Sequence, residues 1–172
     1  ASVGGKNGVN LGGYKNLVGT FNQPEFVLCD PRVLETLPEA EVANGMAEIV
    51  KHALIADAGL FAFLEAHAAA ALALEPPIIE KLVGDSVAIK AGVVAHDERE
   101  AGERRKLNFG HTFGHAFEKV VRRSHGEAVS IGMALAARMS VRMGRLPEEG
   151  YERIIALLRR LRLPVAAAAE FG

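Results

Sequence analysis

The apolar residues from residue 36 onward recur every three or four positions, which is the spacing of one face of an amphipathic helix. Pro76 and Pro77 interrupt this pattern, as do Gly144 and Pro164, so it must divide into separate helices. The alanine-rich residues 65–75 also favour helix, because alanine has the highest helix propensity. We therefore predict a mainly α, multihelical fold of about six helices. They begin at residues 36–39, after Asp57 and after Pro77, and continue at about 107–122, 126–143 and 147–163.

The first 35 residues differ from this helical region. Residues 1–24 contain six glycines and little hydrophobic periodicity, which predicts loop with short extended pieces. The apolar run 25–30 predicts a buried strand, and it must pair with a sheet formed by chain outside this sequence to satisfy its backbone groups. Thr36 stands three residues before Glu39 in a capping-box arrangement, so we expect it at the start of the first helix.

Composition excludes several classes of protein. With 49% hydrophobic and 24% charged residues in 172, the chain has the composition of a soluble globular protein. A net charge of −1 gives no reason to expect a nucleic-acid or membrane partner. The single cysteine, Cys29, lies in an apolar run and is predicted to be buried rather than catalytic. Without a signal peptide or an apolar run of roughly 20 residues, we expect a cytoplasmic location.

The pair His111 and His115 is the first candidate for chemistry. Histidines four residues apart project from one face of a helix, in a chelating geometry for a metal such as zinc. Gly110 and Gly114 lie beside them and each costs the helix about 1 kcal/mol relative to alanine. These glycines indicate the close approach of a ligand or of another helix. Tight helix packing around core histidines is the alternative.

Two further residues are candidates for the same site. His125 opens the next predicted helix, where it can act as a polar cap or reach the same metal. Glu48 stands within an apolar helical segment, so its carboxylate is predicted to be nearly buried. A buried carboxylate needs a partner, and either Lys51 or a metal could serve.

Cationic side chains indicate a site for a small anion. Lys90 interrupts the apolar face of its predicted helix, and a partly buried lysine suits an anionic ligand. His52 follows Lys51 and is a candidate for a supporting contact behind the ligands. The other candidates for handling a phosphate are Lys6, Lys15, Lys51, Arg99, Arg104 and Arg105.

Seven ordered segments together resemble the 3-dehydroquinate synthase family across nearly the whole chain. They are SVGGKNGVN at 2–10, YKNLVGTFNQP at 14–24, LETLPEAE at 34–41, GMAEIVKHALI at 45–55, KAGVVAHDERE at 90–100, RRKLNFGHTFGHAFE at 104–118 and HGEAVSIGMALAARMS at 125–140. Seven blocks in order are far more specific than two histidines at helical spacing.

This resemblance implies a set of site residues. A divalent metal, zinc or cobalt, would be held by Glu48, His111 and His125, with open positions for substrate oxygens. His115 would contact the substrate and not the metal, which differs from the choice that helical spacing favours. The substrate-contacting set would be Lys51, Lys90, Arg104, Asn108 and His115. Residues lining the NAD and active-site side would be Lys6, Lys15, Asn16 and Thr36.

The resemblance also implies a reaction. It is the NAD- and metal-dependent conversion of 3-deoxy-D-arabino-heptulosonate 7-phosphate to 3-dehydroquinate with release of phosphate, a step of the shikimate pathway of aromatic amino-acid biosynthesis, in a homodimer. The alternatives are a related sugar-phosphate cyclase, a metal- and NAD-dependent polyol or alcohol dehydrogenase, and a non-catalytic helical module. A dehydrogenase of neutral substrates would not need Lys51, Lys90 and Arg104 together.

The expected domain organisation follows from the same resemblance. Residues 1–35 would belong to or border an α/β nucleotide-binding domain, and residues 36–172 would form the metal- and substrate-binding domain. Because no such α/β domain precedes Ala1, we expect an excised fragment that is inactive alone.

Overall fold

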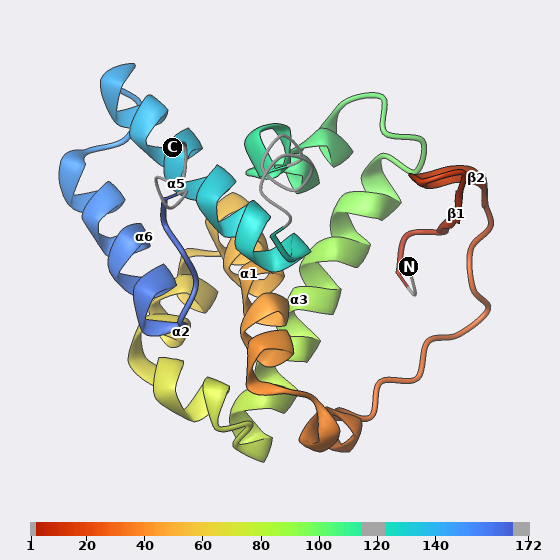
Figure 1. The fold of residues 1–172 in the computed structure, drawn as a ribbon, viewed down its shortest axis with the longest axis horizontal. Helices are drawn as coiled ribbons and strands as arrows, with labels where there is room; N and C mark the ends of the chain where they lie inside the picture. The colour runs from red at the N-terminus through yellow and green to blue at the C-terminus, as the bar shows by residue number, and fades with distance from the viewer. Residues whose placement is uncertain (1–2, 115–122, 167–172) are drawn as a thin grey trace.

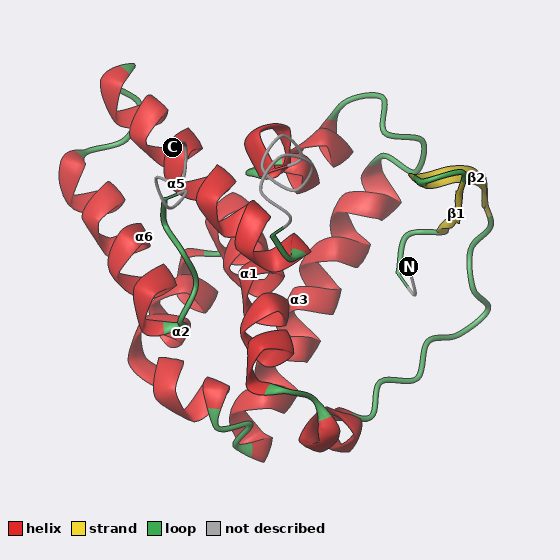
Figure 2. Cartoon of the chain, in the orientation of Figure 1, coloured by secondary structure: helices red, strands yellow, loops and turns green. Residues whose placement is uncertain are grey.

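The computed structural model describes residues 3–114 and 123–166, and the described chain is mainly helical (Figure 1; Figure 2). The prediction of a multihelical, mainly α fold is therefore confirmed. The α-helices with described bounds are α1 (Glu39–Ala56), α2 (Ala58–Leu72), α3 (Pro76–His96), α5 (His125–Arg142) and α6 (Glu148–Arg160). Two 3₁₀ helices, η1 (Pro31–Thr36) and η2 (Glu103–Asn108), and two strands, β1 (Lys6–Leu11) and β2 (Tyr14–Phe21), complete the set.

Helix α1 lies at the centre of the helical body and packs against α2, α3 and α5 (Figure 1). The core forms where the apolar faces of these helices meet, and α6 closes it beside α2 and α5. Its fully buried side chains include Val50, Leu64, Leu82, Met133 and Leu158. Burial of these faces, more than helix propensity, stabilises the arrangement.

The predicted helix starts are partly confirmed. Asp57 caps α2 by accepting a hydrogen bond from the Leu60 amide at 2.9 Å. The capping role predicted for Thr36 is wrong, because its hydroxyl donates to the Val33 carbonyl and Thr36 ends η1 instead. Helix α1 begins at Glu39 without a side-chain cap.

The helix predicted at 107–122 begins later than expected. Residues 103–108 form the 3₁₀ helix η2, and Gly110 with φ of +81° separates it from a helical turn at 111–114. A positive φ favours glycine, so this residue makes the change of direction possible. The rest of the predicted helix, residues 115–122, lies outside the described residues.

The predicted loop over residues 1–24 contains a β-hairpin. β1 and β2 pair antiparallel, and the turn between them consists of Gly12 and Gly13, whose φ angles are +59° and +81°. Two residues with positive φ are the requirement of a type I′ hairpin turn, and this glycine pair was the signal that the prediction missed. Figure 1 shows the hairpin at one side of the helical body, near the C-terminal end of α3.

The strand predicted at 25–30 is not a strand in this structure. The segment is extended, but it joins no ladder among the described residues. Phe26 and Leu28 are 83% and 86% exposed. Cys29 is also exposed, so the prediction that it is buried is wrong. An apolar run becomes a buried strand only where a partner strand is present, and β1 and β2 pair with each other.

Glycines allow the backbone of α5 to approach two other segments closely. A Cβ atom on Gly126 would lie 2.5 Å from the Asn44 backbone in α1, and one on Gly132 would lie 1.8 Å from the Gly110 carbonyl oxygen. A Cβ on Gly114 would lie 2.9 Å from the Ala128 carbonyl oxygen. The close approach predicted from Gly110 and Gly114 is therefore an approach to α5. No helix in the described part of the chain is both long and apolar enough to cross a membrane.

Replacement of Gly132 by alanine should lower the free energy of unfolding by about 3 kcal/mol, because α5 must move away from the Gly110 carbonyl. Gly84→Ala in α3 is the matched control, since a Cβ there meets no atom within 4 Å. It should raise stability by up to about 1 kcal/mol through helix propensity. Urea unfolding of the two variants measures both changes. Equal stabilities would contradict the close packing of α5.

Candidate metal centre and adjoining cavity

Three side chains from distant parts of the chain meet beside α1. Glu48 lies on α1, His111 follows Gly110, and His125 is the first residue of α5. Glu48 Oε1 is 3.4 Å from His125 Nε2 and 3.7 Å from His111 Nε2. The three potential ligand atoms all lie within 4.8 Å of one another. Ligand atoms bonded tetrahedrally at about 2.1 Å to zinc are roughly 3.4 Å apart, so this spacing is of the required size.

The hydrogen bonds of His111 Nδ1 and of the Glu48 carboxylate are compatible with metal binding. His111 Nδ1 lies 3.3 Å from the Phe109 carbonyl oxygen and can donate to it only when protonated, which leaves the Nε2 lone pair unprotonated. Glu48 Oε2 accepts from Lys51 Nζ at 2.5 Å, which is one of the two predicted partners, although the Glu48 side chain is 34% exposed and not nearly buried as predicted. Glu48 Oε1 is buried without a full hydrogen bond from any described residue, since His125 Nε2 at 3.4 Å is at the outer limit. A divalent cation fits this arrangement.

The first turn of α5 fixes His125. Ser124 caps the helix, and its hydroxyl and the Glu127 carboxylate form a capping box. The Ser124 hydroxyl also lies 2.6 Å from Asn44 Oδ1 on α1, as a hydrogen-bond donor. His125 is thus the first residue of a helix whose N-terminus is bound to α1 at Asn44, four residues before Glu48. Ser124, and not His125, is the polar cap of this helix.

The charges at the site shift the pKa values of its members. Burial raises the pKa of Glu48, but the His125 ring, Lys51 and His111 together outweigh it and lower that pKa well below its usual value. The pKa of His111 is lowered by burial and by Lys51, against the opposing effect of Glu48. A deprotonated carboxylate and a neutral imidazole are the forms that bind metals.

A cavity of about 780 Å³ lies next to these three residues, between the hairpin, α1, α3 and η2. It brings together most of the predicted substrate-contacting and NAD-side residues. Those that line it are Lys6, Lys51, Lys90, Arg104 and Asn108, and the predicted metal ligands Glu48 and His111 also line it.

Lys90 is the cation best placed for an anionic ligand. It is half-buried and has no hydrogen bond or ion pair with any residue in the described ranges. Burial lowers the pKa of Lys90, and the nearby charges of Lys51 and Arg104 lower it further, while Glu48 opposes them. An anion in the cavity would stabilise the charged form of this ammonium group.

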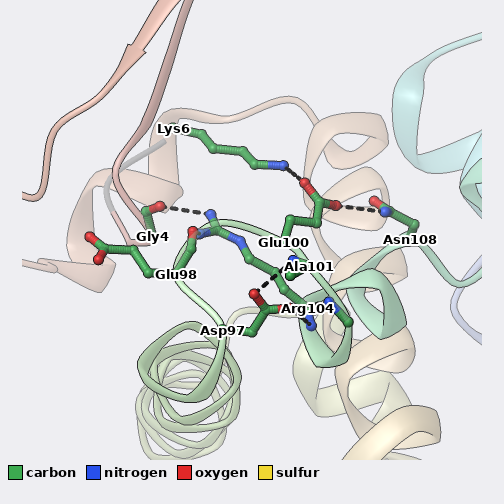
Figure 3. A network of polar contacts seen from close by, with 9 residues as sticks. Gly4, Lys6, Asp97, Glu98, Glu100, Ala101, Arg104 and Asn108 are labelled. Atoms are coloured by element: carbon green, nitrogen blue, oxygen red, sulfur yellow. Dashed lines mark hydrogen bonds and ion pairs between the residues drawn. The ribbon is translucent and has the colours of Figure 1, made fainter.

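Arg104 is 4% exposed and is held by the loop that follows α3 (Figure 3). It donates to the Gly4 carbonyl oxygen at 2.7 Å and to the Glu98 carbonyl oxygen at 2.5 Å. The Asp97 carboxylate accepts from the amides of Ala101, Gly102 and Arg104, which closes the loop and lowers the pKa of Asp97. The buried guanidinium thus places a fixed positive charge at the cavity wall.

Glu100 was not predicted as a site residue, yet it joins two that were. Its carboxylate accepts from Lys6 on β1 and, at 2.8 Å, from Asn108 Nδ2 on η2 (Figure 3). Lys6, against the smaller effect of burial, lowers the pKa of Glu100. Glu100 has φ of +63°, a conformation that costs energy in a residue other than glycine. Its only sequence signal was its place in the charged connector between α3 and η2.

His52 was predicted only as a supporting contact behind the ligands, but it lies in the cavity wall itself. Its side chain is buried, lines the cavity and has Nδ1 2.6 Å from the Ser86 hydroxyl oxygen on α3. Burial lowers the pKa of His52 to about 4, with a contribution from Lys51 and, in part, Lys90. It is therefore neutral at pH 7.

Other predicted site residues are not gathered at this cavity or are not described. Thr36 ends η1, near the opposite end of α1 from the hairpin, and does not line the cavity (Figure 1). The side chains of Lys15 and Asn16, on β2, and the whole of His115 lie outside the described residues. Arg99 and Arg105 line a separate, more open cavity of about 780 Å³, whose wall also includes Glu100 and Asn108.

The fold and the site define a class of protein. It is a helical domain that brings one carboxylate and two imidazoles together at the edge of a cavity lined by cations. The family model described as 3-dehydroquinate synthase C-terminal matches residues 45–171, and the one described as 3-dehydroquinate synthase N-terminal matches residues 1–44. The chain belongs to the 3-dehydroquinate synthase family.

Individual relatives agree with this assignment. The chain is 52% identical to the 3-dehydroquinate synthase of Halorhodospira halophila over 98% of its own length and 49% of the relative. It is 47% identical to that of Pseudomonas aeruginosa over 99% of its length and 47% of the relative. The chain thus spans about half the length of the curated relatives it matches.

Solved structures with the same fold belong to cyclases with other products. A 2-epi-5-epi-valiolone synthase from Streptomyces hygroscopicus, solved with NAD⁺ and Zn²⁺, matches with TM-score 0.89 and 34% identity over 97% of this chain and 48% of that one. A 2-deoxy-scyllo-inosose synthase, solved with carbaglucose-6-phosphate, NAD⁺ and Co²⁺, matches with TM-score 0.81 and 34% identity over 91% of this chain and 44% of that one.

Stability of the metal-free protein should fall as pH decreases from about 6.5 to about 4, because unfolded His52 binds a proton in this range and the folded residue does not. In His52→Gln this contribution is absent. As the pH falls from about 7.5 to about 4, the free energy of unfolding should therefore decrease more in the wild type than in the variant. Urea unfolding with a chelator present measures it. Parallel pH profiles would contradict a neutral buried His52.

Proposed function

We propose that this chain forms the metal- and substrate-binding part of a 3-dehydroquinate synthase. The reaction would convert 3-deoxy-D-arabino-heptulosonate 7-phosphate to 3-dehydroquinate with release of phosphate. The observation that carries this proposal is the meeting of Glu48, His111 and His125 beside a cavity that Lys51 and Lys90 also line. A metal site next to a cationic cavity suits a substrate that carries both adjacent oxygens and a phosphate.

Glu48, His111 and His125 would hold the metal, zinc or cobalt, and NAD would bind against the same cavity. When bound, the metal supplies Lewis-acid polarisation of substrate oxygens, and NAD accepts and returns a hydride. The two solved neighbours named above contain NAD⁺ with Zn²⁺ or Co²⁺. The contact of His111 Nδ1 with the Phe109 carbonyl and the buried Oε1 of Glu48 support this ligand set.

The cations of this chain would bind and orient the phosphate-bearing substrate. Lys90 offers an ammonium group without a protein partner in the described ranges, so it can neutralise a phosphate oxygen directly. Arg104 already donates to two backbone carbonyls, so it would act mainly through its fixed charge. Lys51 is bound to Glu48 and would place its charge between the metal ligands and the substrate.

Asn108 would contact the substrate through the amide that now donates to Glu100, and Lys6 would lie on the NAD side. We propose the same NAD-side role for Lys15, Asn16 and Thr36 and a substrate contact for His115, as the family resemblance implies. We also propose that residues 1–35 border the nucleotide-binding domain, that the complete enzyme is a cytoplasmic homodimer, and that residues 36–172 carry the metal and substrate site.

The second candidate is a related sugar-phosphate cyclase, and the two solved neighbours at 34% identity favour it. The curated relatives at 47–52% identity favour dehydroquinate formation. A phosphate and two adjacent oxygens are common to the substrates of both, so the metal site and the cations fit either. The substrate must therefore be tested directly.

Loss of a proposed metal ligand should abolish tight zinc binding. Glu48→Gln and His125→Ala should each weaken zinc affinity by about hundredfold or more, since even outer contacts of a metal site contribute tenfold to hundredfold. His67→Gln is the matched control, because His67 lies on α2, stacked on Phe63, and away from the cavity. Competition with a fluorescent chelator gives the affinities. Unchanged affinity in both ligand variants would exclude this metal site.

Incubation of the complete enzyme, of which this chain forms the metal- and substrate-binding part, with NAD, zinc and 3-deoxy-D-arabino-heptulosonate 7-phosphate should release inorganic phosphate and form 3-dehydroquinate. Lys90→Met should lower kcat by about 10²-fold, because the charge that stabilises the leaving phosphate is lost. Lys81→Met is the control on the same helix, since Lys81 is exposed and paired with Asp85. Turnover of sedoheptulose 7-phosphate or glucose 6-phosphate in preference would assign the protein to the other cyclases.

A further inference from the structure

One buried polar atom in the cavity wall has no place in the scheme above. His52 lies on α1 one turn after Glu48, and its side chain is 5% exposed. Its Nδ1 is satisfied by the Ser86 hydroxyl at 2.6 Å. Its Nε2 is buried and has no hydrogen-bond partner among the described residues. The residue lines the cavity together with Lys51 and Lys90.

An unpartnered buried ring nitrogen is costly. Leaving such a group without a hydrogen bond destabilises a protein by about 1–3 kcal/mol, whereas an apolar side chain of similar size would cost nothing. Ser86 already fixes Nδ1 of the ring, and His52 as a residue lines the cavity. Lys51 and Lys90, both near the ring, favour its neutral form and attract anions to the same space. A ligand in the cavity can therefore supply the partner that the protein does not.

We propose that His52 contacts the substrate directly, through a hydrogen bond from Nε2–H to an oxygen of the phosphate-bearing, polyhydroxylated ligand in the cavity. This contact requires the Ser86 hydroxyl, 2.6 Å from Nδ1, to donate to that nitrogen, so that the ring proton lies on Nε2. This assignment rests on the proposed function for the identity of the ligand. Ser86 acts as a positioning residue on α3, one turn before Lys90.

Two conservative variants separate a ligand contact from a purely structural bond to Ser86. The side-chain amide of glutamine reaches the position of Nε2, and that of asparagine reaches the position of Nδ1. His52→Gln therefore keeps a group facing the cavity, whereas His52→Asn keeps a group facing Ser86. A ligand contact favours glutamine, and a structural role favours asparagine.

Calorimetric titration of the complete, zinc- and NAD-loaded enzyme with the phosphonate analogue of 3-deoxy-D-arabino-heptulosonate 7-phosphate, which cannot release phosphate, tests this. Affinity should stay within about threefold of wild type in His52→Gln and fall about tenfold in His52→Asn, the effect of one lost hydrogen bond. His67→Gln, on α2 and away from the cavity, should bind like wild type. Equal affinities in the two His52 variants, or weaker binding by glutamine than by asparagine, would overturn the proposal.

The same titration separates this proposal from the proposed function. If the wild-type protein does not bind the compound, the proposed function fails and this contact fails with it. If the wild-type protein binds and the two variants do not differ as stated, only the His52 contact fails. Long-range ¹H–¹⁵N spectra of the imidazole rings give a second readout. They should show the Nε2–H tautomer at His52, with its resonance shifted on binding, and an Nδ1–H tautomer would overturn the donor role.

Discussion

The site depends on one packing contact, the approach of the α5 backbone to α1 and to the turn at Gly110. Gly126 and Gly132 leave no room for a Cβ atom at these crossings. Because Asn44 lies one turn before Glu48 and Gly110 directly precedes His111, the contact sets the distances between the candidate metal ligands. The ligand spacing is therefore a property of closely packed backbone, which is difficult to deform.

Helical periodicity predicted most of the fold, and local hydrogen bonding explains where it failed. The helix bounds near Asp57 and Pro77 follow from capping and from the missing proline amide, both of which are readable from a few residues. The pairing of β1 with β2 was not predicted, because neither face of the hairpin is buried. Its sequence therefore lacks the alternation of apolar and polar residues that marks a half-buried strand. The run 25–30 was predicted as a strand from its apolar composition. That composition does not reveal whether a partner strand is present to pair with it.

The candidate site was predictable in its residue types and not in its long-range contacts. Spacing alone favoured His111 with His115, and only the family resemblance implied His125 and Glu48 as the partners. The structure brings Glu48, His111 and His125 together across three segments, which no local pattern can specify. The contact of His52 with Ser86 joins residues 34 positions apart, so it depends on how α1 packs against α3.

The balance of charge in the cavity favours the proposed anionic ligand, although the chain as a whole carries a charge of −1. Glu100 offsets the charge of Lys6, and Glu48 offsets that of Lys51. Arg104 donates to backbone carbonyls, which carry no charge, so its positive charge remains. Within the described ranges, Lys90 has no such partner. A metal bound by Glu48 would weaken the ion pair of that carboxylate with Lys51, and it would leave the cavity wall more positive. In the proposed function, the two halves of the site would thus be coupled, because occupation of the metal ligands would increase the attraction of the same cavity for a phosphate.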